Sequence, residues 1–291
     1  MSQKADRGDR AEGIAPRTPL SRFLLPGATA LLTLLLFFPV VRWLIHQWLT
    51  NDYYSHGPLV VVISAYFFWL YGKKARGNPS NVGAVLVAAG LLLYLWSLLQ
   101  SAYYIGAIGF VLFLAGLIAF LWGLEALKKL WFPVVFLLLM IPFPFVERAS
   151  YPLQKLTGIY ATHLARLIGI DATVSGAQVS LPKAHLVVGA QCSGLRSIVA
   201  MLTLSVLFVY IVEGSLWKKL IVLLSAFPAA IAGNILRVAS LLFVANIWGA
   251  DKGFEYYHDY SGIVFFVSAL ILLFVIAGAL GCNKFRDDIY P

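Results

Sequence analysis

The chain has 291 residues, of which 60% are hydrophobic and only 12% are charged, and its mean hydropathy is +0.84. These values lie outside the range of soluble domains and predict an all-α polytopic membrane protein. Spans of about 20 residues use up most of this length and leave no room for a separate soluble enzyme. The net charge of +9 fits basic residues that set membrane topology better than it fits nucleic acid binding.

Apolar runs between charged breaks predict about eight transmembrane helices. They lie at residues 24–41, 58–72, 82–100, 103–123, 130–146, 193–212, 220–245 and 260–281. Residues 1–22 are too polar to pack and are expected to form a flexible tail. Residues 23–291 then make up a single transmembrane domain.

The basic residues favour a cytoplasmic N-terminus, because cytoplasmic segments carry an excess of Lys and Arg. With that orientation, more than half of the Lys and Arg residues fall on the tail and on the inward loops. These are Lys4, Arg7, Arg10, Arg17, Arg22, Lys73, Lys74, Arg76, Lys128, Lys129, Lys218, Lys219, Lys284 and Arg286. Both termini are then cytoplasmic.

The segment from about 147 to 191 is expected to cover the outer ends of the helices. Apolar residues recur at helical spacing from Leu153 to Leu167 with polar residues between them, which predicts a helix lying in the membrane interface. Small polar and β-branched residues then alternate around Gly176 and Pro182, which predicts a short hairpin that leads to Cys192.

Cys192, Arg237 and His258 are expected at one membrane level although the chain order separates them. Cys192 precedes Ser193, a candidate helix cap, so the sulfur of Cys192 would lie near a helix N-terminus, where the dipole favours a thiolate. Arg237 lies about 27 Å along the seventh helix from its inner end, close to the far edge of a hydrocarbon core about 30 Å thick. His258 lies at the outer entrance to the eighth helix.

A thiol, an imidazole and a guanidinium suit acyl transfer. The thiolate attacks a carbonyl, the imidazole carries the proton, and the cation stabilises the oxyanion. A thiol with a pKa near about 8.5 is only slightly ionised at neutral pH, so a nearby cation would help. Arg237 is the first candidate and Arg196 the second, while Asn234 lies on the same helix face as Arg237.

Structural roles are the alternatives for each of these residues. A lone Cys in an apolar chain is usually a packing residue, and this interpretation fits Cys282, which lies at the opposite membrane side from Cys192. Arg237 is alternatively paired with an acid such as Glu255 or Asp259, and His258 is alternatively an interfacial anchor. Ser193 and Ser197 flank the thiol, but capping and packing explain them better than nucleophilic roles. The histidines lack metal-ligand spacing, and no phosphate-binding loop is present, so no metal or other cofactor is expected.

Three motifs, CSGLRS, GNILRV and HDYSG, occur in this order on successive predicted helices. With them the chain resembles the exosortase and archaeosortase family of membrane cysteine transpeptidases. The YSHGPLV, IPFPF and VSGAQVSLP stretches are also similar to family patterns. The chain departs from the family where Gly189, Ala190 and Gln191 precede the Cys, because many members have an acidic residue there.

The resemblance implies protein sorting at the surface of a bacterial inner (plasma) membrane, with the active site facing the periplasm. Substrates would be secreted proteins whose C-terminal tail holds a short motif such as Pro-Glu-Pro, a transmembrane helix and a basic cluster. By the resemblance, Cys192 is the nucleophile, His258 the proton shuttle and Arg237 the transition-state stabiliser, with Asn234, Arg196 and Ser193 in support. The acyl group would pass from a thioester to a surface acceptor, such as a lipid-linked or polysaccharide group.

Three alternatives remain open at this point. A processing protease would use the same residues but pass the acyl group to water. A transporter would also accommodate an Arg within a helical bundle, although the polar residues cluster at one face. An assembly scaffold would tolerate changes at Arg237 and His258.

Overall fold

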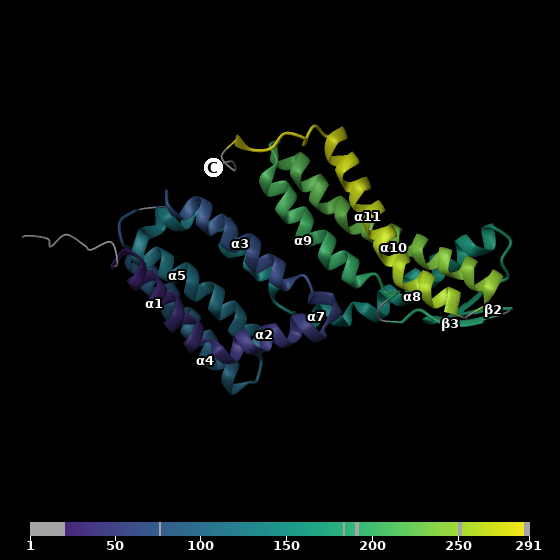
Figure 1. The fold of residues 1–291 in the computed structure, drawn as a ribbon, viewed down its shortest axis with the longest axis horizontal. Coiled ribbons are helices and arrows are strands. Elements are labelled where there is room, and N and C mark those ends of the chain that lie inside the picture. The colour runs from purple at the N-terminus through teal and green to yellow at the C-terminus, as the bar shows by residue number, and fades with distance from the viewer. Residues whose placement is uncertain (1–20, 76, 183, 190–191, 250–251, 288–291) are drawn as a thin grey trace, which may run out of the picture.

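The computed structural model describes residues 21–75, 77–182, 184–189, 192–249 and 252–287. Figure 1 shows two groups of helices that lie side by side and are joined near one end by α7 and α8. The first group contains α1 (Ser21–Leu36), α2 (Phe38–Thr50), α3 (Gly57–Gly72), α4 (Asn81–Leu99), α5 (Tyr103–Lys129) and α6 (Trp131–Phe136), with 3-10 turns η1 (Asp52–Tyr54) and η2 (Leu137–Met140). The second contains α9 (Leu195–Ile211), α10 (Leu216–Trp248) and α11 (Lys252–Ala279), and α7 (Pro144–Arg148) and α8 (Ser150–Leu167) connect the two.

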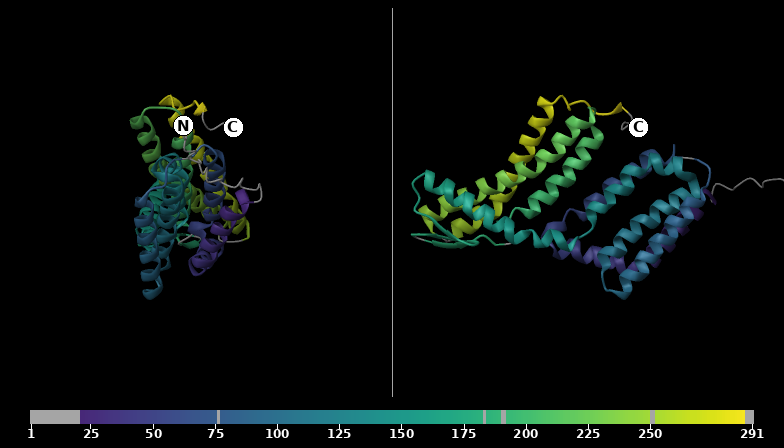
Figure 2. Two further views of the ribbon diagram at one scale, coloured as in Figure 1. Left: turned by 90° about the vertical axis from the view of Figure 1, so that its left-hand side faces the viewer. Right: turned by 180° about the vertical axis from the view of Figure 1, so that it is seen from behind.

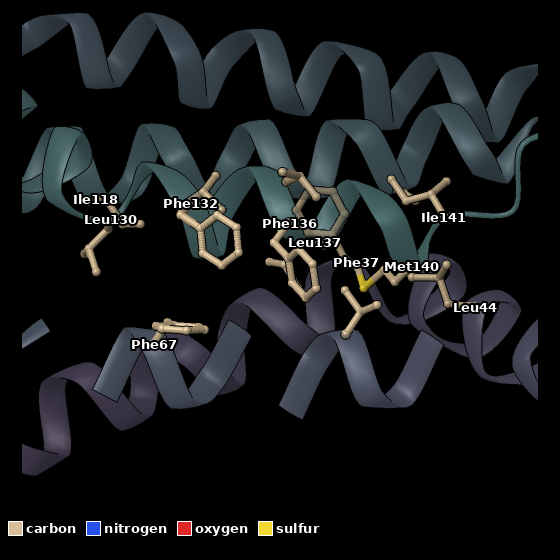
Figure 3. Close-up of a cluster of buried hydrophobic side chains, with 14 of the residues drawn as sticks. Phe37, Leu44, Phe67, Ile118, Leu130, Phe132, Phe136, Leu137, Met140 and Ile141 are labelled. Carbon is tan, nitrogen blue, oxygen red and sulfur yellow. The ribbon is translucent and has the colours of Figure 1, made fainter. Parts of the chain in front are cut away.

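The first group packs around an aromatic and aliphatic core. Phe37, Phe136 and Ile141 are at most 1% exposed, and Figure 3 shows them facing the same interior as Phe67 and Met140. Helices α4 and α5 approach so closely that a Cβ added at Gly90 would lie 2.7 Å from the carbonyl oxygen of Gly109. Small residues permit such contact between helices in lipid, where apolar burial gives little driving force.

Proline breaks two of the predicted spans. The run expected at 24–41 is two helices, α1 and α2, bent by 77° next to Pro39. The run expected at 130–146 is α6 and η2, and the chain bends by 48° before α7, which begins at Pro144. Proline lacks a backbone N–H and clashes with the preceding turn, which explains both breaks.

In the part of the chain that the structure describes, fewer helices than the eight predicted are long and apolar enough to span a membrane. Among the described residues, four helices are long and apolar enough to cross a membrane, or up to six if each bent pair is one span. Helices α3 and α9 have only 16 and 17 residues. The chain is therefore a mostly helical, multi-pass membrane protein, and the count of eight stays a prediction.

The segment before Cys192 is folded against α10. Helix α8 packs on α10 with a buried face of small residues that includes Thr157, Gly158 and Ala161. It is followed by an antiparallel sheet of three short strands, rather than one hairpin, in the order β1 (Thr173–Ser175), β2 (Gln178–Leu181) and β3 (Ala184–Val187). Figure 1 shows β2 and β3 at the far end of α10, beside α8.

Basic loops gather at the opposite end of the helices from this sheet. The ammonium group of Lys129 donates to the carbonyl oxygen of Lys74, at 3.1 Å, so two of the predicted inward loops are neighbours. The carbonyl oxygen of Lys284 accepts from the N–H of Glu213 in the loop before α10. Figure 2, from behind, shows the ends of α9 and α11 together on the side away from the sheet. The predicted tail falls almost entirely on residues 1–20, which lie outside the described residues, and α1 already includes Ser21 and Arg22.

Candidate active site

Cys192 lies in a tight turn between β3 and α9. The turn requires Gly194, whose φ of +78° is a left-handed conformation. Gly194 is the N-cap of α9, so the cap predicted at Ser193 is displaced by one residue. The Ser193 hydroxyl still accepts a hydrogen bond from the N–H of Leu195, at 3.3 Å.

The sulfur of Cys192 is in contact with His258 on α11. Its Sγ lies 3.2 Å from Nε2 of the imidazole, although 66 residues separate the two in the chain. Both side chains are partly buried. A thiol and an imidazole at this distance can exchange a proton directly.

Arg237 on α10 is held against α11 beside the imidazole. Its Nε donates to Oγ of Ser261 at 3.3 Å, and Nη2 donates to the carbonyl oxygen of His258, also at 3.3 Å. The Ser261 hydroxyl donates to the same carbonyl at 3.0 Å. Gly262 leaves room for the guanidinium, since a Cβ there would lie 3.6 Å from its central carbon. The side chains of Glu255 and Asp259, the predicted alternative partners, lie outside the described residues.

Asn234, one turn before Arg237, connects three elements at the site. Its Nδ2 donates to the carbonyl oxygen of Cys192 at 2.9 Å and to Oγ1 of Thr157 on α8 at 3.2 Å. The residue is 5% exposed, and its Oδ1 has no hydrogen-bond partner among the described residues. The amide thus fixes the backbone that carries the thiol.

Arg196 takes a different position from the one expected beside the thiol. Its guanidinium lies 4.0 Å from the Asp52 carboxylate and 3.5 Å from the Ser55 hydroxyl, both in the segment between α2 and α3. Because both charged side chains are more than half exposed, this ion pair adds little stability. Arg196 therefore bridges the two helical groups at the site end.

Burial and charge act on the thiol in opposite directions. Burial raises the pKa of Cys192, while the positive charge of Arg237 and a hydrogen bond from the Gly189 backbone lower it, and burial has the largest effect. Burial therefore disfavours the thiolate of Cys192, and Arg237 favours it.

Two cavities meet at the Cys192–His258 pair. A large one of about 910 Å³ lies between the helical groups and is lined by residues 50–53, Arg196, Arg237 and His258, among others. A smaller one of about 300 Å³ lies between β3 and α10 and is lined by Cys192 and His258. Of these two cavities, Arg237 borders the large one, Cys192 borders the small one, and His258 borders both.

The structure adds residues that the sequence did not single out. Ser261 lies one turn after His258 within the HDYSG motif, so helical spacing offered a signal for it. Thr157 lies on α8 and Asp52 in the first helical group, and no local pattern pointed to either. Cys282 is buried beside Gly214 at the far end of α11, away from the thiol at Cys192. No group of metal-binding side chains occurs among the described residues.

The chain matches the family model described as transmembrane exosortase over residues 48–275. This range contains Cys192, Arg237 and His258. No curated protein and no solved structure matches the chain significantly.

Proposed function

The chain belongs to the transmembrane exosortase family, and from this premise we propose that it is a cysteine transpeptidase that cleaves the C-terminal sorting signal of secreted proteins. The contact of 3.2 Å between the Cys192 sulfur and His258 Nε2 carries the proposal. A buried thiol needs a base to become a nucleophile, and the imidazole is at hydrogen-bond distance.

The proposed reaction has two steps. In the first, Cys192 Sγ attacks the peptide carbonyl carbon while its proton moves to His258 Nε2. The C–N bond then breaks, and the imidazolium returns that proton to the leaving amine, which leaves a thioester on Cys192. In the second, the acceptor's hydroxyl or amine attacks the thioester, its proton passes to His258, and the sulfur is released and reprotonated.

Arg237 is proposed to stabilise the oxyanion of both tetrahedral intermediates. Its position against the His258 carbonyl and its exposure to the large cavity put a fixed cation beside the reacting groups. Asn234 is proposed as a positioning residue, because it holds the Cys192 carbonyl without touching the sulfur. Arg196 and Ser193 are proposed to support the substrate cavity and the turn, respectively.

The substrate is proposed to be a tail with a short motif, a transmembrane helix and a basic cluster. The site is proposed to face the periplasm, with both termini in the cytoplasm of a bacterial inner membrane. The lysines gathered at the opposite end of the helices support this orientation, because basic residues are concentrated in cytoplasmic loops. The acceptor is proposed to be a lipid-linked or polysaccharide group.

Co-expression with a secreted reporter that ends in such a tail tests the proposal. Cys192→Ala, Arg237→Gln and His258→Ala are each expected to leave the tail uncleaved, with losses of at least about 10²-fold for the last two. Cys282→Ser is the matched control for Cys192 and is expected to process the reporter normally. Processing by Cys192→Ala would remove the enzyme hypothesis and leave a transporter or scaffold.

Mass spectrometry of the released reporter separates transfer from hydrolysis. Transfer predicts a new C-terminus joined to an acceptor, whereas a processing protease predicts a free carboxylate. Hydroxylamine added during turnover should release a hydroxamate if a thioester forms on Cys192. A free carboxylate in every product would contradict the transpeptidase assignment.

A further inference from the structure

The small cavity beside the thiol has an unusually uniform lining. Among the described residues that line it, all except Cys192 and His258 are aliphatic, namely Leu186, Val187, Val188, Val238, Leu241 and Leu242. Its volume of about 300 Å³ is at the lower end for ligand pockets, which suits one side chain better than a larger molecule.

The chemistry of acyl transfer determines which part of the substrate lies in each of the two cavities beside Cys192 and His258. The leaving amine must reach His258 to receive its proton, and the oxyanion must face Arg237. Both of these residues line the large cavity. The residue that supplies the acyl group stays bound to the sulfur of Cys192, and of the two cavities Cys192 lines the small one. The side chain of that residue therefore has the aliphatic pocket beside it.

We propose that the pocket between β3 and α10 is the specificity subsite for an apolar side chain on the substrate residue that supplies the acyl group to Cys192. Burial of a Leu-sized or Phe-sized side chain there is favourable, while a charged one would lose its hydration without a partner among the described lining residues. This inference rests on the proposed function for its reaction step, but the pocket can be tested without turnover.

The preference of the pocket for apolar groups can be measured with thiol-reactive probes. An alkyl methanethiosulfonate forms a disulfide with Cys192 and releases methanesulfinate, so its alkyl group takes the place of the substrate side chain. In the Cys282→Ser background, detergent-purified protein is treated with isobutyl, benzyl, decyl and 2-sulfonatoethyl reagents. The reference is an exposed thiol, introduced as Ser175→Cys in a Cys192→Ala, Cys282→Ser background. The rate of each reagent at Cys192 is divided by its rate at this reference thiol, which corrects for partition of the reagent into micelles.

The isobutyl or benzyl reagent is expected to react about tenfold faster than the sulfonatoethyl reagent after this correction. Val238→Phe fills the pocket and should abolish the preference, whereas Val244→Phe, a matched change at a buried position outside the lining, should keep it. Leu186→Ala enlarges the pocket and should shift the reagent preference toward the benzyl thiosulfonate. This variant is the second test if Val238→Phe fails to fold.

Equal corrected rates for apolar and charged reagents in folded protein would overturn the subsite. A decyl rate well above the isobutyl and benzyl rates would also overturn the subsite, because it would indicate a groove for lipid chains rather than a pocket for one side chain. Normal tail processing by Cys192→Ala would instead reject the proposed reaction, so the two failures are distinguishable.

Discussion

Burial of Cys192 makes the thiol dependent on its neighbours for ionisation. Its pKa is raised by burial, and the guanidinium of Arg237 opposes the rise. A thiol loses its proton as pH increases, so alkylation by iodoacetamide is expected to accelerate through a midpoint above the ordinary value of about 8.5. Arg237→Gln removes a charge that favours the thiolate, so the midpoint should move to still higher pH.

Alkylation rates measured by mass spectrometry between pH 6 and 11, in the Cys282→Ser background, test this expectation. Arg196→Gln is the matched control, because Arg196 pairs with Asp52 and not with the thiol, and its midpoint should equal that of the parent. A midpoint in Arg237→Gln that stays in place or falls would show that Arg237 does not stabilise the thiolate.

At the scale of elements, the turn before α9 depends on one glycine. Gly194 has a φ of +78°, and a Cβ there would lie 2.7 Å from Cγ of Asn234. Gly194→Ala is therefore expected to lower the free energy of unfolding by at least about 1 kcal/mol and to push Asn234 away from the Cys192 carbonyl. Reporter processing by Gly194→Ala should also fall, by about 10²-fold if the thiol of Cys192 moves by about 1 Å.

Gly189→Ala is the control within the same segment. Among the described residues, nothing lies within 4 Å of a Cβ placed at Gly189, and the φ of Gly189 is outside the left-handed region. Gly189→Ala should leave both the thermal stability in detergent and the reporter processing unchanged. Equal behaviour of the two variants would show that the turn tolerates side chains and that Gly194 has no special role.

Sequence periodicity predicted elements better than it predicted their bends and contacts. The helix expected at 82–100 is α4 at Asn81–Leu99, because a continuous apolar run with a Ser80 cap defines it locally. The bend next to Pro39 was missed, because the apolar run continues through it. The place of each residue along its predicted span indicated that Cys192, Arg237 and His258 would converge. The contact between Asn234 and Thr157 depends on how α8 packs against α10, and no local sequence pattern encodes that packing.

At the scale of the whole molecule, the two helical groups meet at both ends by different means. At the site end, Arg196 reaches Asp52 and Ser55 across the mouth of the large cavity. At the basic end, Tyr210 of α9 stacks on Phe132 of α6 with ring centroids 3.5 Å apart. The site end thus has a cavity bridged by exposed charges, and the basic end has a packed aromatic contact.

This polarity predicts which surface faces outward. Ser175 lies on β1 at the site end, Ser215 lies in the loop before α10 at the basic end, and both residues are exposed. Each is replaced by Cys in turn, in a Cys192→Ala, Cys282→Ser background. A membrane-impermeant thiosulfonate applied to intact spheroplasts should label the cysteine at 175 and should label the cysteine at 215 only after permeabilisation. The expectation follows from the Lys and Arg residues at the basic end, because basic residues are concentrated in cytoplasmic loops. The reverse pattern would place the thiol of Cys192 in the cytoplasm, where it would not meet secreted proteins, and would contradict both the orientation and the sorting role.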